Sequence, residues 1–85
     1  MKTYMWVATQ IVGNLENWTH DYSRHGEQFP SRRQALVDGY GGLDHDDFNI
    51  ATIENGRVVA FGFGMDDFAP EDCDNLDAVT AAVLP

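Results

Sequence analysis

The chain has 85 residues, the size of a single domain (1–85), and its hydrophobic content of 44% favours a packed core over disorder. Its formal net charge of −9 disfavours direct binding to nucleic acid or anionic lipid, and its single cysteine excludes an internal disulfide framework and fits a reducing compartment. Because no apolar run approaches the ~20 residues of a membrane span, and the N-terminal segment makes a poor signal peptide, we expect a cytoplasmic protein.

The charge is concentrated in the C-terminal part of the sequence. Residues 1–33 carry four basic residues against three acids, a balance of +1. Residues 34–85 carry one arginine against eleven acids, a balance of −10. A field of this sign speeds the encounter with basic proteins, so a basic protein surface is the expected complement.

Residues 3–12 are predicted to form a strand that is largely apolar on both faces, which is typical of a strand inside a sheet or covered on both sides. Gly13 and Asn14 end it. Residues 17–23 alternate between aromatic and polar side chains, which indicates a second strand. Together they would form a first hairpin over residues 3–23, with its loop around residues 13–16.

A short helix is predicted near residues 32–39. Ser31 is its expected N-cap, and Gln34 is in position to reach back from the third helical residue as a capping box. Three side chains should lie on its buried side: Ala35, Leu36 and Tyr40. Three glycines should end it: Gly39, Gly41 and Gly42.

The Asn55-Gly56 pair between two apolar runs predicts a central hairpin over residues 48–63. Both residues tolerate the positive φ angles that the central positions of a type I′ turn need. With these two residues as the loop, Glu54 faces Arg57. The predicted pairing continues outward as Ile53–Val58, Thr52–Val59, Ala51–Ala60, Ile50–Phe61, Asn49–Gly62 and Phe48–Phe63.

One face of this predicted hairpin is bulky and aromatic, as a core face should be. Side-chain alternation places six residues on it: Phe48, Ile50, Thr52, Val59, Phe61 and Phe63. The opposite face is small and mixed, and suits either a closely packed helix or partial exposure.

A second helix is predicted near residues 70–84. Pro70 suits its first turn, and the acids that follow complement the positive end of the helix dipole. Its apolar stripe would consist of Cys73, Leu76, Val79, Thr80 and Val83. The predicted fold class is therefore α+β, an antiparallel sheet of three to four strands with the helices packed on the aromatic face.

Nine acids are the candidate partner-binding residues. In the predicted register Asp46 lies opposite Met65, so the acids at the two ends of the hairpin should meet at one pole, beside the acidic start of the last helix. The nine are Asp44, Asp46, Asp47, Asp66, Asp67, Glu71, Asp72, Asp74 and Asp77.

Three interpretations of this acidic pole stay open: a solvated surface, an interaction surface for a basic protein, and a Ca²⁺ or Mg²⁺ site built from carboxylate oxygens. The spacing matches no EF-hand loop, and no two carboxylates are marked as an acid–base pair, so we expect no metal, no cofactor and no catalytic residue.

The remaining chemically active side chains point to no site. His20, His25 and His45 lack metal-ligand spacing. Cys73 falls on the apolar stripe of a helix, as an inert buried thiol does. Three arginines, Arg24, Arg32 and Arg33, are interpreted as an exposed helix start or as partners of the chain's own acids.

In size, acidity and aromatic α+β make-up, the chain resembles the small non-enzymatic proteins that phages carry against host defences, the anti-CRISPR inhibitors above all. This resemblance is one of general character over the whole chain. It implies that the acids at 44–47, 66–67 and 71–77 form a surface that occupies a nucleic-acid channel of an effector complex, in the host cytoplasm if the chain is phage-encoded.

The leading hypothesis is a non-enzymatic binding protein that inhibits or modulates a basic, nucleic-acid-handling partner by mimicking nucleic acid. One alternative is a small structural or oligomerising domain, such as a homodimer, because residues 3–12 could present an exposed edge strand. The other is a divalent-metal-dependent enzyme that uses the acidic cluster.

Overall fold

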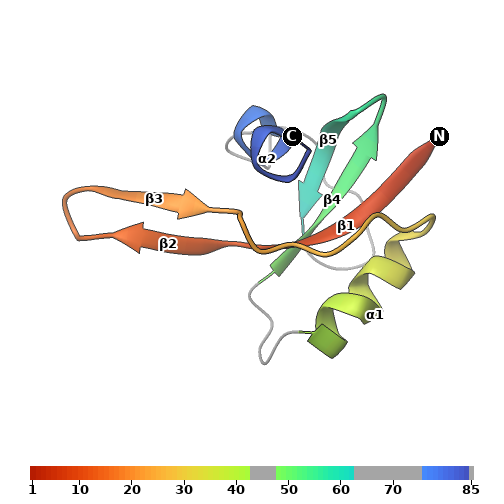
Figure 1. The fold of residues 1–85 in the computed structure, drawn as a ribbon, viewed down its shortest axis with the longest axis horizontal. Coiled ribbons are helices and arrows are strands. Elements are labelled where there is room, and N and C mark those ends of the chain that lie inside the picture. Colours follow the sequence, from red (N-terminus) through yellow and green to blue (C-terminus); the bar gives the residue numbers. More distant parts are fainter. Residues whose placement is uncertain (43–47, 63–75, 85) are drawn as a thin grey trace.

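The computed structural model describes residues 1–42, 48–62 and 76–84 and has an α+β fold, which confirms the predicted fold class. Its elements follow one another in the order β1 (Lys2–Ala8), β2 (Gln10–Gly13), β3 (Trp18–Asp21), α1 (Arg32–Gly42), β4 (Phe48–Glu54), β5 (Arg57–Gly62) and α2 (Leu76–Val83). Strands β1, β4 and β5 form an antiparallel sheet in the order β1-β4-β5, and β2 and β3 form a separate two-stranded sheet (Figure 1). No helix in the described ranges is long and apolar enough to cross a membrane.

The turn between β4 and β5 forms where the sequence predicts it. Asn55 and Gly56 have φ angles of 55° and 78°, as a type I′ turn requires. The expected register holds only for the two pairs next to the turn, Glu54–Arg57 and Ile53–Val58. Beyond them the pairing shifts by one residue, so that β4 faces β5 through Thr52–Ala60, Ala51–Phe61 and Ile50–Gly62.

This shift corrects the predicted distribution of aromatic side chains. The extra residue on β5 is a β-bulge, which reverses the facing of the rest of the strand. Phe48 and Ile50 therefore stay on one face of the sheet, whereas Phe61 lies on the other with Ala51. The prediction of a single aromatic core face was wrong, because the bulge divides the large side chains between two clusters.

Each face of the sheet is covered by its own helix, which also corrects the expectation that both helices share one face. Ala35 of α1 belongs to the first cluster, built around Trp6, Ala8, Phe48 and Ile50. The second cluster includes Val79 and Val83 of α2 and is otherwise formed by Met5, Val7, Ala51, Ile53, Val58 and Phe61. The two helices accordingly lie on opposite sides of the sheet (Figure 1).

Helix α1 begins with the predicted cap but ends later than expected. The Gln34 backbone N–H donates to Ser31 Oγ (3.2 Å), and Ser31 Oγ–H donates to Gln34 Oε1 (3.0 Å). Gly39 lies inside the helix rather than ending it, and its lack of a Cβ lets Phe48 pack closely, since a Cβ there would lie 2.7 Å from Phe48 Cε2. The helix continues to Gly42.

In α2 the predicted apolar stripe is confirmed where the structure describes it. Val79 and Val83 are buried, and Thr80 Oγ accepts a hydrogen bond from the Val58 N–H of β5 (3.0 Å). The predicted start of this helix near residue 70, including Cys73, lies outside the described residues.

The outer edge of β1 is covered by residues 24–29. The N–H groups of Tyr4 and Ala8 donate to the carbonyls of Phe29 and Arg24 (both 2.8 Å), and Gly26 N–H donates to the Trp6 carbonyl (3.0 Å). The expected exposed edge is therefore absent over this part of the predicted 3–12 strand. Returning chain supplies the partners that a neighbouring strand would otherwise supply.

The second half of that predicted strand leaves the sheet at Thr9 and becomes β2. It pairs with β3 through Ile11–His20, Val12–Thr19 and Gly13–Trp18, so the predicted first hairpin is confirmed as a two-stranded unit. The loop between its strands is held by Asn14 Oδ1, which accepts the N–H groups of Glu16 (3.0 Å) and Asn17 (2.9 Å). We call residues 10–21 the arm and the rest of the described chain the body. Figure 1 shows the arm projecting from the body.

Candidate functional site

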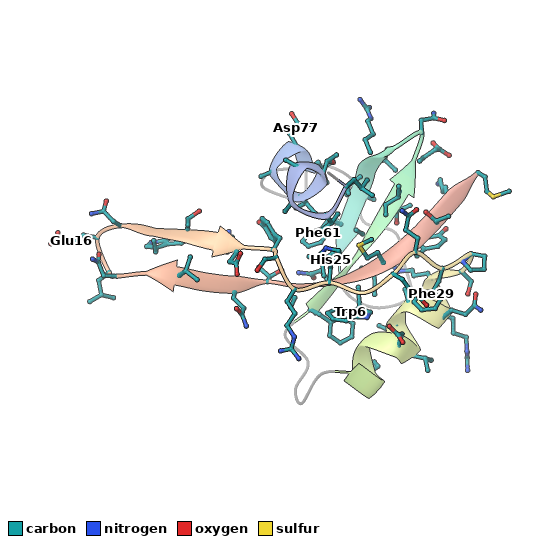
Figure 2. The ribbon with its side chains drawn as sticks, in the orientation of Figure 1. Trp6, Glu16, His25, Phe29, Phe61 and Asp77 are labelled. Atoms are coloured by element: carbon teal, nitrogen blue, oxygen red, sulfur yellow. The ribbon has the colours of Figure 1, made fainter. Side chains whose placement is uncertain are left out.

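The predicted acidic site falls almost entirely outside the described residues. Only Asp77 is described: it is exposed in the first turn of α2 and points away from the sheet (Figure 2). The other eight lie outside the described ranges: Asp44, Asp46, Asp47, Asp66, Asp67, Glu71, Asp72 and Asp74. The register that placed Asp46 opposite Met65 does not hold beyond Ile53–Val58, so their gathering at one pole stays a prediction.

The described histidines have structural neighbours. His25 Nδ1 lies 3.0 Å from the Gly26 carbonyl, in the segment that covers β1. His20 lies between two aromatic rings, 5.4 Å from Trp18 and 6.0 Å from Tyr22. Within the described ranges, no three His, Cys, Asp or Glu side chains are close enough together to hold a metal ion. His45 and Cys73 lie outside those ranges.

The three arginines do not form one exposed cluster, which corrects the interpretation for Arg32. Only 7% of Arg32 is exposed, and its guanidinium reaches the sheet, donating to Gly62 O (3.0 Å) and Thr52 Oγ (3.4 Å). Its position in the first turn of α1, which lies over the sheet, aims the long side chain inward. Arg24 and Arg33 are exposed.

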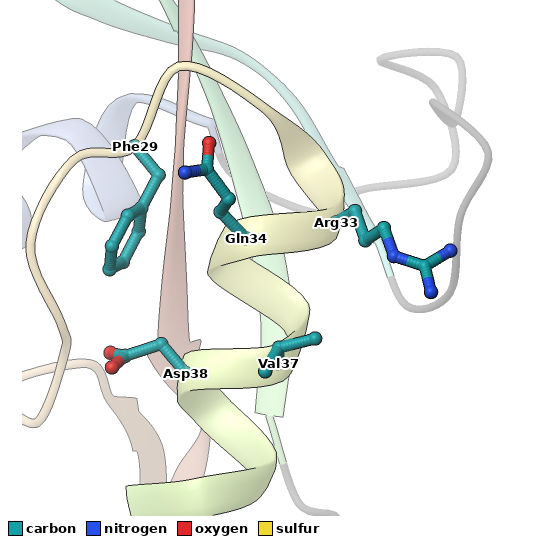
Figure 3. A pocket seen from close by; sticks show the side chains of 5 residues that line it. All are labelled: Phe29, Arg33, Gln34, Val37 and Asp38. Carbon is teal, nitrogen blue, oxygen red and sulfur yellow. The ribbon is translucent and has the colours of Figure 1, made fainter.

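A groove of about 320 Å³ runs along the outer side of α1. It is lined by Phe29, Arg33, Gln34, Val37 and Asp38, and Figure 3 shows Phe29 and Asp38 on one side with Arg33 directed away from them. The Asp38 carboxylate accepts a hydrogen bond from Trp6 Nε1 (2.7 Å), so one wall of this groove is tied to the core. Phe29 also packs against the cluster around Trp6, whereas Arg33, Gln34 and Val37 are exposed, and the groove is open.

The arm carries the most exposed apolar surface of the described chain. Because directly paired residues share a face, Ile11, Trp18 and His20 lie on one side of the arm, while Val12 and Thr19 lie on the other. Ile11 is 68% exposed and Trp18 is 55% exposed. Leu15, in the loop at the tip, is 99% exposed. A groove of about 530 Å³ is lined by Ile11, Gly13, Asn14, Leu15 and Trp18.

A series of aromatic contacts connects this apolar face to the body. It runs from Trp18 to His20, from His20 to Tyr22, and from Tyr22 to Phe61, whose rings meet edge to face at 6.0 Å. These contacts connect the base of the arm to the body, although no part of the body covers Ile11 or Leu15. Side chains of this type left in water usually mark a contact surface.

The sequence reasoning missed this apolar face. The alternation pattern places Ile11 and Trp18 in predicted strands, and Leu15 falls in the predicted loop between them. Two signals could have found it: the polar pair Thr9-Gln10, which interrupts the apolar run, and a leucine between the turn-forming Asn14 and Glu16.

Comparisons of the chain with protein-family models, curated proteins and solved structures found no match. The interpretation of the acidic residues and of the arm therefore rests on the chain's own charges and geometry.

Proposed function

We propose that the chain is a non-enzymatic binding protein that inhibits or modulates a basic, nucleic-acid-handling protein by electrostatic mimicry. The observation that carries the proposal is the charge distribution: a balance of −10 over residues 34–85 against +1 over residues 1–33. Carboxylates at such density offer a basic groove the same sign of charge as a phosphate backbone. The resemblance to small acidic anti-defence proteins, anti-CRISPR inhibitors above all, supports the same function.

The nine acids named above would form the binding surface, with Asp77 on the outer side of α2 as its described member. Such a surface displaces nucleic acid by competing for the same Lys and Arg side chains. Its attraction acts over a Debye length, about 8 Å at physiological salt, so the association rate should depend strongly on ionic strength.

The test begins with affinity capture of the basic partner from host lysate, followed by calorimetry with the purified partner over a salt series. We expect the affinity to fall as salt rises, and nucleic acid to compete with the chain for the partner. A quadruple charge reversal, Asp46→Lys, Asp47→Lys, Asp66→Lys and Asp67→Lys, should weaken binding by at least about a hundredfold, since each charge contact contributes about 0.5–1 kcal/mol or more. Salt-independent binding, or binding that survives this reversal, would disprove mimicry.

A matched pair of single substitutions separates a localised surface from net charge alone. Asp77→Lys and Glu27→Lys each change the net charge by the same amount at an exposed position. If the acids of residues 34–85 form the binding surface, Asp77→Lys should weaken binding several-fold and Glu27→Lys should change it by less than about twofold. Equal effects would mean that net charge alone governs the encounter.

A further inference from the structure

We propose that the tip of the arm, residues 11–18, docks on a protein surface that combines apolar side chains with arginine or lysine, and that this surface belongs to the basic partner. The inference rests on the proposed function and adds a second contact to it: the acids after residue 34 attract the partner, and the tip binds it at short range. Three observations carry it: the exposed groove at the tip, the fixed geometry of the loop, and the sign of the charges on the arm.

The tip offers an apolar groove that the described chain leaves exposed. The groove of about 530 Å³ is lined by Ile11, Gly13, Asn14, Leu15 and Trp18, and all five residues are exposed. Figure 1 shows this end of the arm as the part of the described chain that lies farthest from the sheet and the helices. A projecting element with apolar side chains at its end is shaped to enter a concave site on another protein.

The loop that presents Leu15 has a fixed backbone. Asn14 Oδ1 accepts the N–H groups of Glu16 and Asn17, and the Asn14 N–H donates to Asn17 O (3.1 Å). Gly13 has a φ angle of 113°, and a Cβ there would overlap Asn17 O, so this corner of the loop requires glycine. Leu15 is therefore held in water by an organised loop, which loses little conformational entropy when a partner binds it.

The charges on the arm select a basic surface. The arm contains Glu16 and Asp21 and no lysine or arginine. Asp21, at the base, accepts hydrogen bonds from the N–H and hydroxyl of Ser23 (3.3 and 2.9 Å), whereas Glu16 is exposed at the tip (Figure 2). A carboxylate two residues from the exposed Trp18 indole suits arginine or lysine, because these cations stack on indole faces and pair with carboxylates. The same acids, together with the net charge of −9, repel a second copy, nucleic acid and anionic lipid.

Nuclear magnetic resonance of the full chain with short synthetic peptides tests the tip directly. The two tryptophans should give separate indole N–H signals, because Trp6 Nε1 donates to Asp38 in the body whereas Trp18 is exposed. A peptide that alternates arginine and leucine should shift the Trp18 signal and leave the Trp6 signal unchanged. It should bind at least about tenfold more tightly than a peptide that alternates arginine and serine, or one that alternates glutamine and leucine.

The other results of this titration would overturn the proposal. Equal affinity for the arginine–serine peptide would mean that the acids bind arginine without help from the arm. Equal affinity for the glutamine–leucine peptide would mean that the tip has no preference for a basic surface. A Trp18 signal that shifts with protein concentration before any peptide is added would identify a second copy as the occupant.

Two substitutions separate the apolar contribution from the charged one. Leu15 and Glu16 are both exposed, so neither change should unfold the chain, and the Trp6 signal reports whether the body is intact. Leu15→Ser should weaken binding of the arginine–leucine peptide at least about fivefold, and Glu16→Gln should weaken it about two- to fivefold. Thr19→Ser, on the opposite face of the arm, should leave the affinity unchanged. If the peptide binds both tip variants as tightly as the original chain, the tip is not its site.

Failure of this proposal and failure of the proposed function give different results. The arginine–serine peptide reports mainly on the acids after residue 34, so its binding should weaken with salt and with the quadruple charge reversal. If it does not weaken, the proposed function is wrong, and the Trp18 signal still decides whether the tip binds a basic apolar surface. If it weakens while the Trp18 signal stays unchanged with the arginine–leucine peptide, the acidic surface stands and docking by the arm is wrong.

Discussion

The body and the arm are built from similar sequence, and they differ in what covers it. In the body, each apolar face of the sheet has its own helix, and the edge of β1 is covered by residues 24–29. In the arm, the side chains of the apolar face are exposed to solvent. The two tryptophans differ in the same way: Trp6 is 8% exposed and donates a hydrogen bond to Asp38, whereas Trp18 is 55% exposed.

This difference shows that an apolar pattern predicts which side chains favour burial but does not predict which segment covers them. Residues 3–12 are predicted to form one strand that is largely apolar on both faces, yet within the described chain only the part that forms β1 is buried. The part that forms β2 also carries apolar side chains, Ile11 and Val12, and all four of its residues are exposed. Three tests, taken from the largest expected effect to the smallest, show whether the arm contributes to the stability of the body.

Trp6→Ala should have the largest effect. The Trp6 indole lies directly on Gly26, meets the Phe48 ring edge to face at 6.5 Å, and donates to the Asp38 carboxylate. Removing it opens a cavity where β1, α1 and the covering segment meet. The free energy of unfolding should fall by about 3–5 kcal/mol, as measured by urea denaturation followed by circular dichroism.

Trp6→Phe is the control for this substitution, because it keeps a ring in the core and removes the indole N–H. It should cost about 1–2 kcal/mol, the loss of one hydrogen bond to a carboxylate together with a small cavity. A cost below about 1 kcal/mol for Trp6→Ala would mean that Trp6 does not hold these three segments together.

A matched pair of glycine substitutions in α1 should have smaller and opposite effects. At Gly39 a Cβ would meet the Phe48 ring at 2.7 Å, so Gly39→Ala should lower the free energy of unfolding by about 1–2 kcal/mol, net of its gain in helix propensity. At Gly41 a Cβ would meet nothing within 4 Å, so Gly41→Ala should raise it by up to about 1 kcal/mol. Changes of the same sign would contradict the close packing of α1 on the sheet through Gly39.

The parts of the fold that sequence predicts well are local in origin. Asn55-Gly56 specifies its own backbone conformation, and Ser31 with Gln34 marks the start of α1 within four residues. The same holds for the arm, because its loop is closed by Asn14 bonds to residues two and three positions on.

The features that sequence reasoning missed depend on contacts between distant segments. The bulge places Phe61 on the α2 face, where it packs with Val79 and Val83 from a distant segment. Phe48 packs where a Cβ of Gly39 would lie, and the inward Arg32 guanidinium donates to Gly62 O and Thr52 Oγ. No pattern along a single segment contains these contacts.

The candidate site divides in the same way. The excess of acids follows from the sequence alone, but their gathering at one pole depends on the predicted hairpin register, and all nine but Asp77 lie outside the described residues. The apolar face of the arm was missed because alternation predicts which side of a strand is apolar, not whether the chain returns to cover it.

Trp18→Ala should have the smallest effect on the body. It should change the free energy of unfolding by less than about 0.5 kcal/mol, because more than half of the Trp18 surface stays exposed in the folded chain. The aromatic series from Trp18 through His20 and Tyr22 to Phe61 is a route by which it could affect the body. A loss above about 1.5 kcal/mol would show that the arm is an energetic part of the body.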